Sequence, residues 1–370
     1  MPRPHLRRLF LLCLCLFAGP GLVRPGFGAV AVDATPEAWS RSERISFARY
    51  LGAPAMMLSG GAHVAEGPAF ANGRIEVDVA MHGQRGFVGV VFRYQDPANY
   101  EVVYLRPHKS RLPDAIQYTP TLNGLSAWQL YSGDENMAAA EFPHQRWVRL
   151  AVEFRGRRAE VFLDGAPEPA LSVDLKGDFG AGRVGLWGRN VAHFANFGYE
   201  AFEDERVPPR PAFAAPAAVL DGWEITPSYE ASLVDATRVP EDAAWTPVTL
   251  EAPGLVNISR YRRRVPAEAR EDPDGARDLV WARTIVRSET AGLRRLQLGY
   301  SDAVTVLLNG RPIWRGSSAF GERYPFALGI LGTDHDAVWL PLEAGENELV
   351  FAVEEVFGGW GFAARWADDG

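Results

Sequence analysis

Apolar and polar residues alternate in short runs along most of this chain, starting near Ile45. In residues 73–80, for example, Ile75, Val77 and Val79 fall on one side of an extended chain, whereas Arg74, Glu76 and Asp78 fall on the other. Comparable runs occupy residues 87–94, 116–119, 127–131, 146–154, 158–164, 183–187 and 193–199. Helical periodicity is nearly absent, so the pattern predicts antiparallel sheets that pack face to face as a β-sandwich of the jelly-roll type.

Turn residues connect these runs. The sequence Arg155-Gly156-Arg157 separates two of them and predicts a hairpin, whose inward set is Val148, Leu150, Val152 and Phe154. Further along, Asn309-Gly310 predicts a second hairpin, because this dipeptide favours the left-handed backbone of a two-residue turn.

The composition changes between Glu203 and Ala218, where prolines become dense. Prolines at this density keep a chain extended and prevent strand pairing, so we expect a linker over 204–216 between a domain at 30–203 and a domain at 217–370. The second domain has its own alternating runs, at 279–287, 293–300, 303–308, 312–314, 337–341, 346–353 and 361–366. Residues 266–278 are acidic and proline-rich and predict an exposed loop.

The N-terminus predicts a signal peptide over residues 1–29. Arginines precede an apolar run at 9–18, and small residues follow, which suits cleavage after Ala29 or Ala31. We therefore expect a periplasmic or extracellular protein, and no later segment is apolar enough over sufficient length to predict an integral membrane span. Both cysteines, Cys13 and Cys15, lie in this segment, so the mature chain should contain neither a disulfide nor a thiolate metal site.

The charge argues against two classes of partner. The full chain has a formal charge of −8, and removal of the signal peptide, with four arginines and no acid, leaves about −12. An acidic exported protein is poorly suited to bind nucleic acid or an anionic membrane, because both repel it at long range.

The segment 99–131 is rich in aromatic rings, arginine and histidine. On its opening strand Tyr100, Tyr104, Arg106 and His108 share one side, and Val103 lies on the other. Flat rings beside fixed hydrogen-bonding groups suit sugars, whose C–H faces stack on aromatics and whose hydroxyls need donors and acceptors. The alternative is that these are ordinary strand residues with half-buried rings.

We therefore predict ligand contacts from one set of residues in the first domain: Arg93, Tyr100, Tyr104, Arg106, His108, Gln117, Tyr118 and Trp128. If the protein is an enzyme, Glu101, Asp114 and His108 are the candidate acid and base groups, provided that the fold brings the acids together. In the second domain Asp302, Tyr324 and Trp360 are candidates, although a core position explains Trp360, in its glycine-rich stretch, slightly better, because a large ring fills space there.

Three other patterns are weaker. Residues 180–185 spell Gly-Ala-Gly-Arg-Val-Gly, but a strand rather than a helix follows, so a phosphate would meet no helix N-terminus. Asp334-His335-Asp336 is the one compact cluster of metal-ligand types, and a solvated loop explains it better. No cofactor is predicted, and calcium held by backbone carbonyls and one acid would leave no pattern, so a structural calcium stays open.

These motifs together resemble a family. Residues 72–78, Gly86-Phe87-Val88-Gly89, Asn99-Tyr100-Glu101, Tyr104-Leu105-Arg106-Pro107-His108 and Gln117-Tyr118-Thr119-Pro120 are similar to exported bacterial proteins with a laminin-G-like, concanavalin A-like lectin/glucanase fold. The second domain, with Tyr300-Ser301-Asp302 and Leu308-Asn309-Gly310, resembles galactose-binding-like sandwiches. The resemblance implies carbohydrate without naming a reaction. Glucanases of the first type carry Glu-x-Asp-x-Glu on one strand, and here Ala80 replaces the third acid.

Three functions follow as hypotheses. The first is an exported, non-catalytic protein that binds a poly- or oligosaccharide through the aromatic, Arg and His groove. The second is a glycan-processing hydrolase or lyase. The third is a structural module that binds protein at the cell surface.

Overall fold

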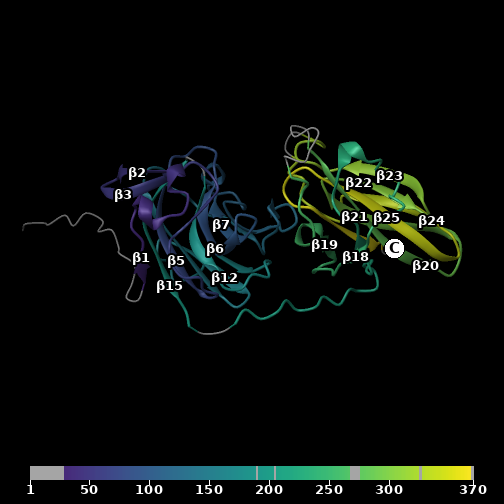
Figure 1. Ribbon diagram of the computed structural model, residues 1–370, viewed down its shortest axis with the longest axis horizontal. Coiled ribbons are helices and arrows are strands. Elements are labelled where there is room, and N and C mark those ends of the chain that lie inside the picture. The colour runs from purple at the N-terminus through teal and green to yellow at the C-terminus, as the bar shows by residue number, and fades with distance from the viewer. Residues whose placement is uncertain (1–28, 189–190, 204–205, 267–275, 325–326, 368–370) are drawn as a thin grey trace, which may run out of the picture.

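The computed structural model describes residues 29–188, 191–203, 206–266, 276–324 and 327–367. Over these residues the fold is all-β, with two β-sandwiches side by side, as the alternation predicted (Figure 1). The helical segments of the described part are single 3-10 turns: η1 (Pro36–Ala38), η2 (Ser42–Arg44), η3 (Pro107–Lys109), η4 (Ala231–Leu233) and η5 (Ile258–Arg260). None of them has the length or apolarity needed to cross a membrane.

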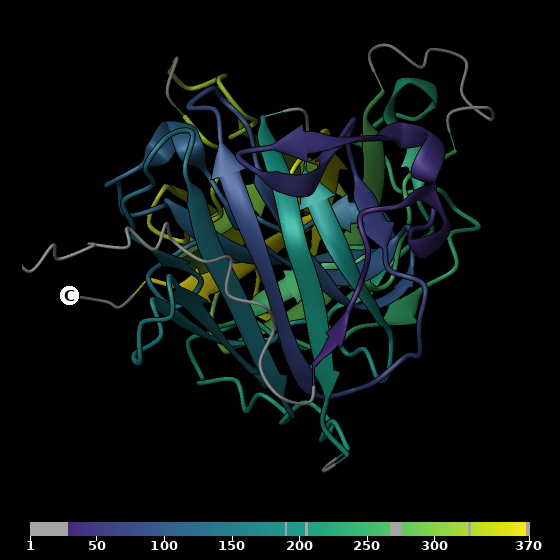
Figure 2. The same ribbon diagram turned by 90° about the vertical axis from the view of Figure 1, so that its left-hand side faces the viewer.

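The first sandwich consists of two antiparallel sheets. The first, which we call the β5 sheet, has the order β13 (Leu171–Asp174), β12 (Arg158–Leu163), β11 (Trp147–Arg155), β5 (Gly73–Met81), β15 (Ala192–Ala201), β3 (Ala53–Leu58) and β2 (Ile45–Tyr50), and β1 (Val30–Ala31) pairs with β15. Figure 2 shows this sheet in front, with the second sandwich behind it. The outer face of the β5 sheet therefore points away from the second sandwich.

The second sheet of this sandwich, the β7 sheet, has the order β10 (Met137–Ala138), β8 (Ile116–Leu122), β7 (Asn99–Leu105), β6 (Val88–Asp96), β14 (Arg183–Gly188) and β4 (Ala62–Val64). A short strand, β9 (Leu125–Ser126), pairs with β8. Because the β7 sheet packs on the β5 sheet, the outer face of the β7 sheet lies on the side where the second sandwich is found.

The core between these sheets follows directly from the alternation. Ile75, Val77 and Val79 of β5 are fully buried and pack with inward residues of β7 and β11. The hairpin β11–β12 closes through the pair Arg155↔Arg158, and Gly156 takes the positive φ of 52° that its tight turn requires. Burial of this continuous apolar layer is the main stabilising term for a sandwich without disulfides.

The second sandwich also consists of two antiparallel sheets. Its larger sheet, the β25 sheet, has the order β18 (Thr246–Pro247), β16 (Glu224–Ile225), β20 (Asp278–Ser288), β25 (Gly345–Glu355), β22 (Ala303–Leu308) and β23 (Arg311–Ser317), with β17 (Tyr229–Glu230) on β20. Its smaller sheet has the order β19 (Leu255–Asn257), β26 (Gly361–Trp366), β21 (Gly292–Ser301) and β24 (Asp336–Leu342). Asn309 and Gly310 form the two-residue turn between β22 and β23, both with positive φ, as predicted.

Two local predictions were wrong. The run 127–131 is not a strand but part of a loop, because its residues bind the second sandwich instead of a neighbouring strand. Asp278, placed at the end of an exposed loop by composition, begins β20 and is fully buried, since Arg264 and the backbone N–H of Val265 bind its carboxylate. The middle of that loop, at 267–275, lies outside the described residues.

The loop between β9 and β10 joins the two sandwiches. The Gln129 side-chain amide donates to the carbonyl of Leu328 (2.7 Å) and accepts from the hydroxyl of Ser301 (2.9 Å). Nearby, the Tyr131 hydroxyl donates to Glu251 (2.7 Å) and accepts from Asn257 (2.8 Å). This junction is therefore built from buried, specific hydrogen bonds between residues far apart in the sequence.

Candidate functional site

Five aromatic rings gather on the outer face of the β7 sheet, and we call them the aromatic face: Phe87, Tyr94, Tyr100, Tyr104 and Trp187. Tyr100 and Tyr104 lie there because alternate residues of β7 point outward, while Val103 and Leu105 point into the core. This division of β7 was predicted. The other three rings come from β6, its entry and β14.

A glycine lies between two of these rings, those of Tyr104 and Trp187. Gly89 of β6 pairs with Tyr104 on one side and Trp187 on the other. A Cβ atom at Gly89 would lie 2.0 Å from the carbonyl oxygen of Val103, so only glycine fits. Because this position has no side chain, the flanking rings pack against each other, with centroids 5.4 Å apart and planes at 32°.

The rings differ in what they offer to a solute. Tyr104 is only 5% exposed, and its hydroxyl donates to Gln117 of β8 (2.7 Å). Tyr100 is 9% exposed and stacks on Tyr94, with centroids 5.7 Å apart. Phe87, Tyr94 and Trp187 are half-buried and present the accessible ring surface of the aromatic face.

Charged groups lie at one end of the aromatic face, where β7 leads into η3. Arg106 binds Asp114 (2.5 Å) and lies over the ring of Phe87. His108 accepts a hydrogen bond from the backbone N–H of Gly86 at Nδ1, so its neutral ring carries the proton on Nε2. Burial, with help from the nearby charges of Arg106 and Arg85, lowers the pKa of His108 from its usual 6.5, which favours that neutral form.

Two predicted ligand contacts are in the interior instead. Arg93 has a left-handed backbone, with φ of 47°, at a bulge between β6 and β7. This irregularity breaks the alternation and turns the guanidinium inward, where it donates to the carbonyls of Ala71 (2.8 Å) and Gly156 (2.6 Å). Tyr118 is fully buried in the core, and its hydroxyl donates to Glu101 (2.7 Å). Neither side chain faces solvent, so both contribute to the core rather than to a groove.

The candidate acids do not form a pair. Glu101 is fully buried on the inward side of β7, and its burial raises the pKa of its carboxyl group. Asp114 instead binds Arg106 (2.5 Å), which follows β7 five residues after Glu101, about 16 Å from it at strand spacing. Glycoside hydrolases place their two carboxyl groups about 5 to 9.5 Å apart.

The other strand carboxylates are used in ion pairs. Both oxygens of Asp78 bind Arg149 of β11, and the amide of Asn196 donates to one of them (2.7 Å). Glu76 binds the same arginine (3.2 Å). These contacts tie β5 to its neighbours in the sheet.

The remaining predicted residues are at or beyond the junction. Trp128 packs on Phe320 and Phe357 of the second sandwich, away from the aromatic face. Asp302 is fully buried and accepts the backbone N–H groups of Val356 (2.7 Å) and Phe357 (2.8 Å).

Of the other two candidates in the second sandwich, Trp360 is fully buried in the core and donates to the carbonyl of Val353 (3.1 Å). Only Tyr324, at 60%, is well exposed.

Two histidines lie in contact, which the sequence did not indicate. His82 and His193, which are far apart in the chain, approach to 2.8 Å between Nε2 and Nδ1, and Tyr50 stacks on His193. Among the described residues no group of three or more His, Cys, Asp or Glu side chains is arranged to hold a metal ion. In the Asp334–Asp336 cluster, Asp336 instead binds the hydroxyl of Tyr300 (2.7 Å).

Phe87, Tyr94 and Trp187 are the site residues that the sequence reasoning missed. Their runs were recognised as strands, but a strand pattern does not reveal which neighbours it pairs with. The register Trp187↔Gly89↔Tyr104 places the rings together. An outward aromatic in a strand whose neighbour carries a glycine is the signal that could have suggested them.

Comparison with known proteins gives structural similarity at low identity. No protein-family model matches the chain, and no curated protein sequence matches it. Solved structures that match include the carbohydrate-binding module CBM66 from Bacillus subtilis (15% identity, 47% of this chain and 92% of that one, TM-score 0.33). Others are a β-glucanase of Bacillus licheniformis (12%, 48% and 100%, 0.34) and the exoplasmic/lumenal domain of VIP36 bound to Ca²⁺ and Man3GlcNAc (14%, 49% and 91%, 0.34).

Proposed function

We propose that this protein is an exported, non-catalytic carbohydrate-binding protein whose first sandwich binds a glycan on the aromatic face. The observation that carries the proposal is the set of three half-exposed rings, Phe87, Tyr94 and Trp187, held on a rigid sheet by buried Tyr100 and Tyr104. Rings that are fixed before binding lose little conformational entropy when a sugar stacks on them.

The chemistry of the surface suits a sugar. The C–H faces of a pyranose pack on flat aromatic rings, while its hydroxyls need donors and acceptors at the margin. His108 supplies an Nε2–H donor in its neutral form, and Arg106 is held in place by Asp114. A surface that binds an apolar segment of another protein would need the rings but not these polar groups.

The charge at this end suggests the kind of glycan. Arg85, Arg106 and Lys109 surround His108, and Asp114 is the acid that binds both Arg106 and Lys109. A carboxylate or sulfate on the glycan would gain from this excess of positive charge, even though the protein as a whole is acidic. We therefore expect acidic glycans to bind more tightly than neutral ones of the same length.

Two features support binding without catalysis. Glu101 is enclosed in the core, and Asp114 is bound to two cations, Arg106 and Lys109. A glycoside hydrolase would need two such groups facing one bond of the sugar.

Export is part of the proposal. Cleavage after Ala29 would leave Val30 and Ala31 to pair with Tyr199 and Gly198 of β15, whereas cleavage after Ala31 would remove this strand. Residues 1–28 of the signal segment lie outside the described residues. Mass spectrometry of the mature protein should therefore find Val30 at its N-terminus.

A glycan array followed by calorimetry tests the binding. Trp187→Ala should weaken the tightest glycan at least tenfold, about 1.4 kcal/mol, because it removes the largest half-exposed ring. Trp339→Ala is the matched control, since this tryptophan is 59% exposed on β24 of the second sandwich.

Arg106→Ala should weaken acidic glycans more than neutral ones. Glycan binding that survives Trp187→Ala and Tyr94→Ala in folded protein would remove the aromatic face from the proposal. Turnover of a bound glycan would contradict its non-catalytic part.

A further inference from the structure

The second sandwich has a cavity of about 880 Å³ that no sequence motif indicated. It lies on the outer face of the β25 sheet, under a segment that runs from Glu230 to Thr237. Apolar residues of this segment and its continuation, among them Val234, Val239 and Trp245, pack on the outer face of the sheet. The segment therefore covers the sheet while leaving a hollow beside it.

The sheet side of the hollow includes one small residue, Thr305, next to other small residues of the same face. Thr305 of β22 pairs with Ala352 of β25, and Ala303, two residues earlier on the same face, pairs with Glu354. Larger residues, Leu279 and Arg315, flank this patch on β20 and β23. The apolar residues of the covering segment pack on the cluster of Leu279, Leu307 and Ala352, and the cavity lies beside this contact, at Thr305 and Glu354.

A buried hydroxyl without a partner belongs to one residue of the cavity wall, Thr305. Thr305 is 3% exposed, and its Oγ1 has no hydrogen-bond partner in the described part of the chain. An unsatisfied buried hydroxyl costs about 1–3 kcal/mol, and valine would fill the same space without that cost. A ligand hydroxyl in the cavity would satisfy it.

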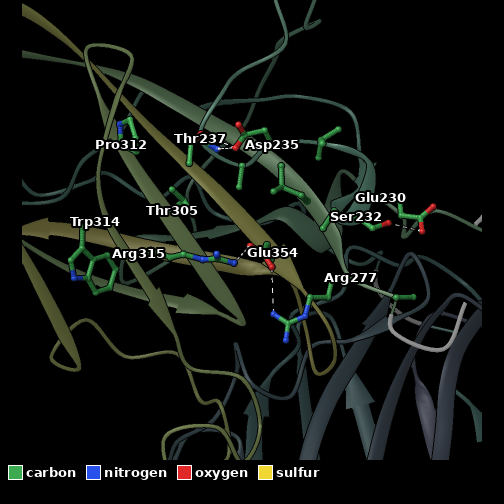
Figure 3. Close-up of a pocket in the computed structure, with 15 residues that line it drawn as sticks. Glu230, Ser232, Asp235, Thr237, Arg277, Thr305, Pro312, Trp314, Arg315 and Glu354 are labelled. Atoms are coloured by element: carbon green, nitrogen blue, oxygen red, sulfur yellow. Dashed lines mark hydrogen bonds and ion pairs between the residues drawn. The ribbon is translucent and has the colours of Figure 1, made fainter. Parts of the chain in front are cut away.

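Charged groups in the wall are arranged to hold hydroxyls. Figure 3 shows Arg277 and Arg315 reaching Glu354 from two sides, at 3.4 and 3.1 Å. The opposite wall carries Asp235, whose carboxylate accepts from the hydroxyl of Thr237 (2.7 Å). Arginine and carboxylate side by side can donate to one sugar hydroxyl and accept from the next.

The balance of charge indicates a neutral ligand. Glu230, Asp235 and Glu354 line the cavity together with Arg277 and Arg315, so neither sign dominates. Arg277 also forms an ion pair with Glu322 (3.2 Å). Its positive charge is thereby compensated further, so it would bind an anion less tightly. A volume of this size suits a ligand of drug-like size rather than an ion.

We infer that this cavity is a second binding site, for a short neutral oligosaccharide. It shares the broad ligand class of the aromatic face but does not rest on it, since no residue is common to the two. Apolar wall residues such as Leu279 and Pro312 would meet the C–H face of the sugar, and Thr305, Glu354 and the two arginines would bind its hydroxyls.

Saturation-transfer NMR on the full chain, with neutral trisaccharides of glucose, galactose, mannose and xylose as probes, tests the inference. Thr305→Val should weaken the bound probe about fivefold, the loss of one hydrogen bond, while leaving the melting temperature equal or higher. Ala236→Phe should abolish binding by filling the cavity from the covering segment. Arg287→Ala is the matched control, because Arg287 forms an exposed ion pair with Glu346 on the same sheet.

Trp187→Ala separates the two sites. Neutral binding that falls with Thr305→Val and Ala236→Phe, but not with Trp187→Ala or Arg287→Ala, supports the second site whether or not the aromatic face binds a glycan. The inference is overturned if no neutral probe binds, if both cavity variants bind the probe as tightly as the wild type, or if only Trp187→Ala weakens binding.

Discussion

Replacing Tyr131 by phenylalanine tests whether the two sandwiches unfold as one unit. Tyr131 lies in the first sandwich's loop at the junction, and its hydroxyl is buried between residues of the second. It donates to Glu251 and accepts from Asn257 and Arg260, at 2.7, 2.8 and 3.2 Å. The variant removes one oxygen atom and leaves the ring in place.

The expected loss follows from these three contacts. A hydrogen bond to a charged group contributes about 1.5–3 kcal/mol, and the buried amide of Asn257 loses an acceptor as well. Glu251 keeps its ion pairs with Arg260 and Arg210, so its charge remains compensated. We therefore expect a destabilisation of about 2–4 kcal/mol, or on the order of 5–10 °C in melting temperature.

Differential scanning calorimetry measures the effect, and limited proteolysis reports on the junction. The wild type should show one transition, and Tyr131→Phe should show an earlier, broader or split one, with faster cleavage near 206–216. Tyr261→Phe is the matched control, because its hydroxyl bonds to Thr249 at an exposed position within the second sandwich. A loss below about 0.5 kcal/mol in Tyr131→Phe, equal to that in the control, would show that the junction contributes little.

Two further predictions concern titrating groups. Burial raises the pKa of Glu355 well above its usual value, and its Oε2 has no partner among the described residues. Ionisation of the Glu355 carboxyl group therefore destabilises the fold as the pH rises above about 4.5. Glu355→Gln should raise the melting temperature at about pH 8, and this gain should vanish near about pH 4.5. An equal gain at the two pH values would contradict the reasoning. His108 has a lowered pKa, so its titration by NMR should have a midpoint below 6.5, and Arg85→Ala should move the midpoint upward; no movement would remove Arg85 as a cause.

The strands were predictable because alternation is a local property. Residues 73–80 and 146–154 predicted β5 and β11 to within a residue or so, and their inward sets are the ones buried. The run 127–131 is also rich in apolar residues, but Gln129 and Tyr131 form hydrogen bonds with residues of the second sandwich instead of with a neighbouring strand. Local pattern cannot separate a strand from a loop that is buried by a distant partner.

The candidate site was predictable only in part, and the reason is register. On β7 the outward set Tyr100 and Tyr104 could be read from alternation, because that strand is regular. Arg93 could not, because a bulge with a left-handed residue reverses the side to which it points. Trp187 belongs to the site through its pairing with Gly89, a contact between residues about a hundred positions apart.

Both proposed sites arise from side-chain size on the outer face of a sheet. On the β7 sheet, Gly89 leaves a gap that Tyr104 and Trp187 fill by packing on each other, which yields a flat, rigid ring surface. On the β25 sheet, Thr305 lines a gap that the covering segment does not fill. A small residue flanked by rings thus makes a platform, whereas a small residue under a covering segment makes a cavity. The first geometry exposes stacking surface and suits a long chain lying across it, while the second encloses hydroxyl-binding groups and suits a short one. Specificity in this protein is therefore expected to depend on these small residues as much as on the rings and charges beside them.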